Sequence, residues 1–155
     1  MNVVIPKRIV ILFVLAILFL HCRQSKDITE NGYYSFLMLE KGGCMQNCKT
    51  YTIQIDQNGL ADYIGKVNVS KTGRYYRTLS RQEKTELWEC IKRNDVFNFT
   101  GFTGNAGEDS QMRLLVLVKN GVEKKLSYGE LAPKILMNVE AKIEEIAEAG
   151  EWQKR

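Results

Sequence analysis

Two Asn-Gly pairs, Asn58-Gly59 and Asn120-Gly121, constrain the fold of this chain more than any other feature. Both residue types tolerate the positive φ that a two-residue β-turn requires. Each pair also lies between segments of strand-like apolar pattern, so each predicts a β-hairpin. A helical pattern follows each hairpin, and the chain is therefore expected to contain a hairpin followed by a helix, twice.

The helix starts have recognisable capping signals. Ser80 and Glu83 have the spacing of a capping box, in which each side chain bonds the other residue's backbone N–H. Pro133 suits the first turn of the second helix, where a missing N–H is not needed. We expect the first helix to end near Asn94 and the second at Gly150.

The second helix is predicted to be amphipathic, with one apolar stripe facing the sheet and its charged residues elsewhere. The stripe consists of Ile135, Leu136, Val139, Ile143 and Ile146, and the charged residues are Glu140, Lys142, Glu144 and Glu145.

Six segments have the length and patterning of β-strands. They are residues 33–40, 51–56, 60–69, 73–79, 112–118 and 122–128. Most are joined by short turns, so the predicted fold is an α+β domain over residues 33–155. Its antiparallel sheet has five or six strands, a meander plus a hairpin, packed against two helices. Asp95 to Gln111 is expected to be irregular.

Cys44 and Cys48 follow the first predicted strand directly. Residues i and i+4 of a strand lie roughly 13 Å apart, whereas the Cα atoms of bonded cysteines lie about 4.4 to 6.8 Å apart. A disulfide therefore requires the three residues between them to turn, and Gly42-Gly43 offers backbone freedom for that turn.

The amino terminus predicts export. Lys7 and Arg8 precede an unbroken apolar run from Ile9 to Leu20. The run is short for a bilayer helix of about 20 residues, and it fits the roughly 7 to 15 apolar residues of a secretory signal. Residues 1–21 are accordingly interpreted as a signal peptide.

Cys22 directly follows this run and resembles the cysteine of a bacterial lipobox, which becomes the lipid-modified amino terminus after cleavage. His21 stands where the lipobox usually has a small residue, so an ordinary cleaved signal and an uncleaved anchor remain alternatives. With lipidation, residues 22–32 form a lipidated cysteine and flexible tether. The domain is then anchored in the cell envelope, facing the periplasm or the surface.

The charge argues against nucleic acid as a partner. The formal net charge of the whole chain is +4 at pH 7, and cleavage would remove Lys7 and Arg8. A basic segment with aromatic residues, 66–81, is interpreted as a solvated strand face.

The cysteine segment and the last helix together resemble an uncharacterised family of bacterial envelope lipoprotein domains, a domain of unknown function. Its members combine Gly-x-Cys-x-x-x-Cys-Pro-x-Tyr after the first strand with a late Ala-Pro helix start. The matching residues are Gly42, Cys44, Cys48 and Tyr51 in the first motif, and Ala132-Pro133 with Glu140, Ile143 and Trp152 in the second. Lys49 replaces the motif's proline. The resemblance covers roughly residues 36–152 and implies the fold and the compartment, but no activity.

The candidate chemistries are few. Cys44 and Cys48 could exchange disulfides, but redox pairs usually have two intervening residues at a helix start. Removal of His21 with the signal would leave no histidine, which argues against Ser-His and Cys-His catalysis and weakens zinc binding through Cys90. A calcium site is a weak alternative, and its candidates are Asn105, Glu108 and Asp109.

We therefore predict a non-catalytic binding or structural module without a cofactor or metal. It is anchored to the membrane through lipid on Cys22 and carries a Cys44–Cys48 disulfide. Its ligand would be an unidentified envelope protein or glycan. The alternative is a thiol-disulfide redox protein that uses the same two cysteines.

Overall fold

The computed structural model describes residues 33–45, 47–101, 103 and 110–155. The predicted signal peptide and tether, with His21 and Cys22, lie outside the described residues. So do the calcium candidates Asn105, Glu108 and Asp109.

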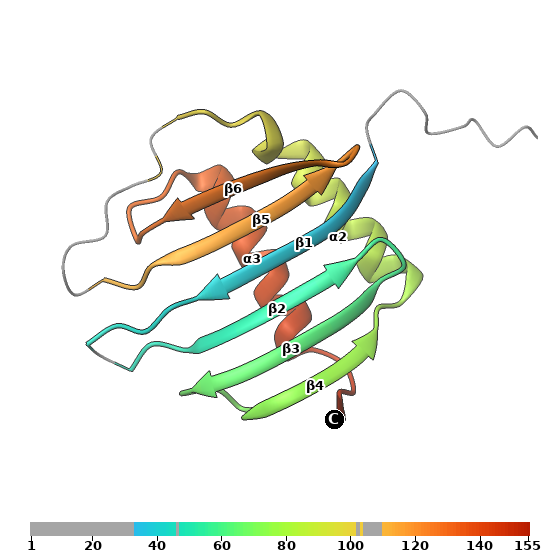
Figure 1. Ribbon diagram of the computed structural model, residues 1–155, viewed down its shortest axis with the longest axis vertical. Coiled ribbons are helices and arrows are strands. Elements are labelled where there is room, and N and C mark those ends of the chain that lie inside the picture. Colours follow the sequence, from blue (N-terminus) through green and yellow to red (C-terminus); the bar gives the residue numbers. More distant parts are fainter. Residues whose placement is uncertain (1–32, 46, 102, 104–109) are drawn as a thin grey trace, which may run out of the picture. The chain divides into compact units, whose positions relative to one another are not determined.

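The described part of the chain forms an α+β domain (Figure 1). Its elements in chain order are β1 (Tyr34–Lys41), β2 (Thr50–Asp56), β3 (Leu60–Val67), β4 (Gly73–Thr78), α2 (Arg81–Arg93), η1 (Val96–Asn98), β5 (Arg113–Lys119), β6 (Val122–Tyr128), α3 (Lys134–Glu148) and β7 (Gln153–Lys154). The two helices and both Asn-Gly hairpins lie where the sequence predicts them. The short 3-10 helix η1 forms inside the segment predicted to be irregular.

The sheet is antiparallel and has seven strands in the order β6-β5-β1-β2-β3-β4-β7, so the prediction of five or six was too low. The additional strand is β7, which pairs with Tyr75 and Tyr76 of β4. The Arg155 N–H continues this pairing by donating to the Arg74 carbonyl at 2.9 Å. A strand of two residues is too short to show alternation, so its sequence carried no signal.

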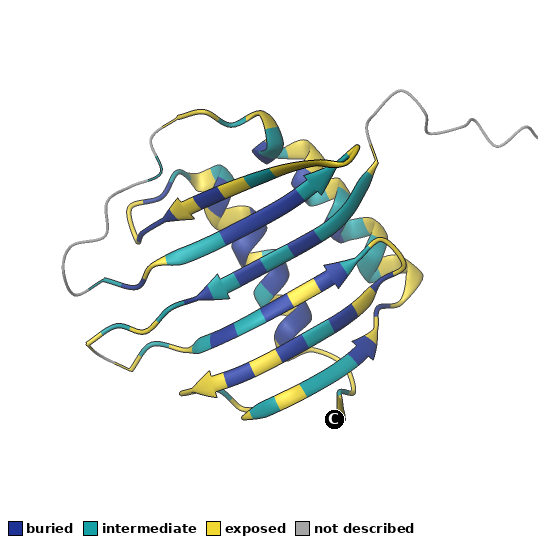
Figure 2. Ribbon diagram, in the orientation of Figure 1, coloured by how far each residue is buried: buried dark blue, intermediate teal, exposed yellow. Residues whose placement is uncertain are grey.

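Both helices cover one face of the sheet, and no helix of the described residues lies over the other face (Figure 1). Buried and more exposed residues alternate along the strands, as expected for a sheet covered on one face (Figure 2). The core lies between the sheet and the helices. Its fully buried large side chains include Leu37, Leu39, Ile53, Ile55, Leu87, Ile91, Leu115, Leu117, Leu136 and Ile143.

The interior strand β1 joins the β5–β6 hairpin to the β2–β3–β4 meander. Met38 lies opposite Gln54 of β2 on one side and opposite Val116 of β5 on the other. With a paired strand at each edge, β1 is an interior strand, which agrees with its dense apolar sequence.

The predicted capping box of α2 is confirmed. The Ser80 hydroxyl accepts the Glu83 N–H at 3.2 Å, and the Glu83 carboxylate accepts the Ser80 N–H at 2.8 Å. Pro133 lies one position earlier than expected, at the N-cap of α3. Neither helix has the length and apolar character needed to cross a bilayer, and this finding covers only the described residues.

Candidate functional site

The loop between β1 and β2, residues 42–49, is here called the cystine corner. Cys44 and Cys48 lie at bonding distance with their Cα atoms 5.8 Å apart, which supports the predicted disulfide. Neither Gly42 nor Gly43 adopts a left-handed φ, so the turn does not depend on that conformation of glycine. A Cβ on Gly42 would lie 3.2 Å from the Met112 carbonyl, so this glycine permits a close approach to the strand beside it.

The cystine corner is fixed to the start of β5 by Gln111. This side chain is only 4% exposed, and its amide donates to the Gly42 and Lys49 carbonyls, each at 2.7 Å. The Gly42 N–H in turn donates to the Met112 carbonyl at 2.9 Å. One buried amide therefore bonds both ends of the corner.

Two further contacts hold the second half of the corner. The Asn68 amide donates to the Cys48 carbonyl at 3.3 Å, and Lys49 forms an ion pair with Glu148 of α3 at 2.7 Å. Both partners of that ion pair are about half exposed, so it contributes less than about 1 kcal/mol. Met45 remains 81% exposed in the cystine corner.

Beside the corner, four polar side chains form a row across the sheet, here called the polar row. Tyr51, Lys41, Arg113 and Tyr128 are register partners on β2, β1, β5 and β6. Directly opposite residues point to the same face of a sheet. The row meets α3, because Lys41 and Arg113 both reach Glu140.

The ion-pair cluster consists of Lys41, Arg113, Glu140 and Glu144. The Lys41 Nζ lies 2.8 Å from Glu140 Oε1 and also bonds Glu144, while the Arg113 Nε lies 3.0 Å from the same Glu140 oxygen. Lys41 is 6% exposed and Glu140 is 8% exposed. Glu140 is thus the shared carboxylate of a buried network.

Electrostatics keep Glu140 ionised. Burial by itself would raise the pKa of this carboxyl, but the hydrogen bond and charge of Lys41, together with Arg113, outweigh burial and bring the pKa below its usual value. Burial raises the pKa of Tyr51 and Tyr128 far above the usual value, and nearby carboxylates add to the rise. Neither phenol makes a regular hydrogen bond within the described part of the chain. The row therefore places an ionised carboxylate, Glu140, beside two phenols that stay un-ionised.

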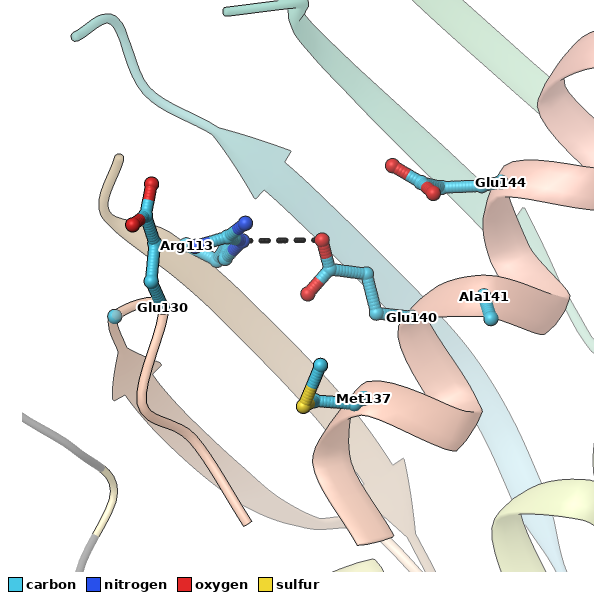
Figure 3. A pocket seen from close by; sticks show the side chains of 7 residues that line it. Arg113, Glu130, Met137, Glu140, Ala141 and Glu144 are labelled. Carbon is cyan, nitrogen blue, oxygen red and sulfur yellow. Dashed lines mark hydrogen bonds and ion pairs between the residues drawn. The ribbon is translucent and has the colours of Figure 1, made fainter. Parts of the chain in front are cut away.

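A hollow of about 180 Å³ opens beside the ion-pair cluster (Figure 3). It is lined by Arg113, Gly129, Glu130, Met137, Glu140, Ala141 and Glu144. The Arg113 guanidinium points across it toward Glu140 (Figure 3).

A family model described as a domain of unknown function, DUF6438, matches residues 35–147, which include the corner, the polar row and nearly all of α3. The chain belongs to the DUF6438 family. Among curated proteins, no sequence matches the chain. The expectation of a family of unknown function is confirmed, while the lipoprotein character expected for its members stays a prediction.

Other candidates in the DUF6438 domain do not form a second site. Cys90 is a half-buried free thiol on α2, with its sulfur 3.8 Å from the Asn138 carbonyl of α3. No three His, Cys, Asp or Glu side chains gather as a metal site in the part that the structure describes. The basic segment 66–81 was wrongly interpreted as one solvated face, because Arg77 is buried and bonds Glu83 at 2.7 Å.

Sequence reasoning missed the ion-pair cluster of the DUF6438 domain. Glu140 was assigned to the charged side of the second helix, yet it is buried under the sheet. Two spacings could have indicated this position. Glu140 lies four residues after Leu136 and three before Ile143, and Lys41 continues the alternation of inward-facing residues along β1.

Proposed function

We propose that this DUF6438 domain is an exported, envelope-anchored module that binds a protein partner and catalyses no reaction. The lipid anchor is Cys22, and the partner is an envelope protein contacted through the cystine corner. The single observation that carries the proposal is the corner itself. Its disulfide, Gln111 and the neighbouring strands hold a loop whose Met45 side chain stays in solvent.

A fixed loop with an exposed apolar side chain favours recognition for a thermodynamic reason. Binding by a mobile loop costs the entropy of ordering it, whereas a loop held before binding avoids most of that cost. Met side chains adapt to irregular partner surfaces, and the Met45 side chain is 81% exposed. A disulfide is also expected to persist in an exported protein.

The protonation states of Glu140, Tyr51 and Tyr128 also support a role in binding and not in catalysis. Catalytic acids and bases usually have pKa values near the working pH. Glu140, in contrast, is held ionised by Lys41 and Arg113, and the two buried phenols are held neutral. This pattern suits a structural network beneath a binding surface.

The redox alternative has weaker support. Low-pKa redox cysteines usually lie at a helix N-terminus or beside an unpaired cation. Cys44 and Cys48 lie in a loop between two strands, and the adjacent Lys49 is paired with Glu148.

Site-specific photocrosslinking in cells tests the proposal. A photoreactive amino acid replaces Met45 in one strain and Val122 in another. Both residues are exposed and apolar, but Val122 lies beside the Asn120-Gly121 turn at the opposite end of the sheet. We expect a discrete crosslinked envelope protein from position 45 only. Equal crosslinking from both positions would contradict recognition through the corner.

Intact mass of the membrane-extracted protein tests the anchor and the disulfide together. We expect a mass that corresponds to lipid on Cys22 as the first residue and to one bridge that reductant opens. An unmodified chain retaining residues 1–21 would overturn the anchor. The redox alternative predicts that the Cys44→Ser/Cys48→Ser variant loses its cellular role and that glutathione readily reduces the bond.

A further inference from the structure

The face of the sheet that points away from the two helices, here called the open face, carries a stripe of apolar side chains (Figure 1). The stripe follows the adjacent strands β1 and β5, where Phe36 lies opposite Val118 and Met38 lies opposite Val116. Leu37, between two of these residues, is fully buried on the helix side, so alternation turns its neighbours to the open face. The open-face stripe consists of Phe36, Met38, Leu114, Val116 and Val118.

The open-face stripe is separate from the core. None of its five residues is part of the hydrophobic cluster that lies between the sheet and the helices, or packs against that cluster. Four of them are partly exposed, and only Val116, in the middle of the stripe, is as little as 3% exposed. The stripe is therefore an apolar surface of its own on the uncovered side of the sheet.

The sequences of β1 and β5 indicate that this side of the two strands is also covered. Strands with one solvated face alternate apolar and polar residues, whereas strands covered on both faces are apolar throughout. β2 alternates, with Thr52 and Gln54 turned to the open face. In contrast, residues 36–39 of β1 and 114–118 of β5 are unbroken apolar runs. Something apolar is expected to lie over these two strands.

The charges on the open face are balanced within it. The three cations of β3, β4 and β6 on this face each form an ion pair with a carboxylate of the same face: Lys66 with Glu40 at 3.4 Å, Arg74 with Asp62 at 2.8 Å, and Lys125 with Glu123 at 2.9 Å. Asp56 accepts the Asn58 and Leu60 N–H groups of the β2–β3 turn. So nearly neutral a face does not repel a second copy of itself, and it has no charge excess that would select an oppositely charged partner.

The open face also has the size that a stable dimer requires. Strands β1 to β6 have six to eight residues each. With about 4.8 Å between strands and a rise of about 3.4 Å per residue, these strands form a face of about 29 Å by about 24 Å. Packing two such faces together would remove about 1,400 Å² of surface from water, and stable interfaces bury about 1,200 to 2,000 Å².

We propose that the open face is the interface of a homodimer, in which the open-face stripe of one copy packs on that of a second copy. Two sheets pack face to face about 10 Å apart with their strands nearly aligned, and a twofold interface uses the same patch on both subunits. A twofold axis along the strands places Tyr33, where β1 begins, at the same end in both copies. Both cystine corners then lie at the other end and stay accessible. The inference goes beyond the proposed function, which concerns the corner alone.

Photocrosslinking of the full chain in cells tests the interface. A photoreactive amino acid replaces Gln54 in one strain and Gln82 in another. Both residues are exposed, but Gln54 lies on the open face with its amide nitrogen 3.7 Å from the Met38 sulfur, whereas Gln82 lies on α2. We expect an adduct of twice the mass of the chain, containing only this chain, from position 54. Position 82 should give none.

Gln54→Arg and Gln82→Arg provide a second test. Two differently tagged copies of the full chain are produced together, and the amount of one that is isolated with the other is measured. An arginine at position 54 reaches solvent in the monomer but would be buried against the second copy, so co-isolation should fall at least about fivefold. Gln82→Arg should leave it unchanged. Equal thermal midpoints of the two variants would show that the fold is retained.

Several results would overturn the assignment: no dimeric adduct from position 54, an adduct there with a different protein or within a single chain, equal adducts from positions 54 and 82, or equal effects of the two arginine variants. The proposed function fails separately, through equal crosslinking from positions 45 and 122. A dimeric adduct from position 54 combined with that failure would retain the homodimer and remove only recognition through the corner.

Discussion

The two ends of the sheet are held by different kinds of interaction. At one end, the turns at Asn58-Gly59 and Asn120-Gly121 depend mainly on local backbone geometry, with φ of 52° at Asn120 and 76° at Gly121, and Asn120 also bonds the backbone of Tyr33. At the other end, the cystine corner and the ion-pair cluster are built from side chains far apart in sequence, such as Lys41 and Glu140.

This difference separates a part of the molecule that encodes the fold from a part suited to function. A tight turn needs only the residues within it, and Asn-Gly supplies them. The corner end instead contains buried charges, which are costly to desolvate and whose replacement by apolar residues often stabilises a protein. Such a network at one end of the sheet, beside the exposed Met45, agrees with the binding role proposed above for the cystine corner.

The largest expected effect is at the shared carboxylate of the corner end. Glu140→Ala leaves the buried Lys41 and the partly buried Arg113 with fewer partners, so the free energy of unfolding should fall by about 3 kcal/mol in urea denaturation. Glu145→Ala, an exposed site on the same helix, should cost under about 1 kcal/mol. Similar losses for the two variants would refute the structural role of the cluster.

A smaller effect is expected in the pH dependence. The folded protein holds the pKa of Glu140 below its unfolded value, so this interaction stabilises the fold above the unfolded pKa and is lost as the pH falls. Denaturation of the wild type and of Glu140→Gln should therefore give stabilities that converge between about pH 6 and pH 3. Glu83, whose pKa Arg77 lowers to about 2, titrates in both proteins and cancels in the comparison. A constant difference would contradict the assignment.

Opening the disulfide should cost less than removing the shared carboxylate. The ring between Cys44 and Cys48 is small, so Cys44→Ser/Cys48→Ser should lower the free energy of unfolding by about 2 kcal/mol, with the far-UV circular dichroism retained. Wild type in reductant should match the variant. Complete unfolding would mean that the corner supports the whole sheet.

The smallest effects are expected from glycine substitutions that compare the two ends. Gly121→Ala forces a left-handed φ on alanine in open space, which should cost about 1 kcal/mol. Gly43→Ala, in the corner, has open space and no left-handed φ, so its thermal midpoint should stay close to that of wild type. The opposite ranking would show that the corner is strained.

The sequence predicted the hairpin end well and the corner end only in part. Asn-Gly turns and the Ser80–Glu83 capping box are local, so their residues sufficed to place β2–β3, β5–β6 and the start of α2. The cysteine spacing indicated a bond but not its surroundings.

The missed features depend on contacts between distant segments. Gln111 bonds the cystine corner only once β5 is paired with β1. The sequence near Gln111 contains no pattern that predicts this pairing. Glu140 is a charged residue, so the sequence predicts that it is exposed. It is buried because Lys41 and Arg113, on two strands of the sheet, form ion pairs with it. β7 was missed because a strand of two residues is too short to show the alternation of apolar and polar side chains that identifies a strand.

The interior position of β1, between β5 and β2, also has a consequence for how the domain folds. Its partner β2 follows closely in the chain, but its partner β5 begins only at Arg113, after α2 and η1. Closing so long a segment costs more entropy than closing a hairpin, so the β1–β5 pairing should be the slow step of sheet assembly. Until β5 pairs, β1 has an open apolar edge, the kind of edge that promotes association between incomplete chains. A domain synthesised or exported from its amino terminus would expose that edge throughout the passage of the intervening residues.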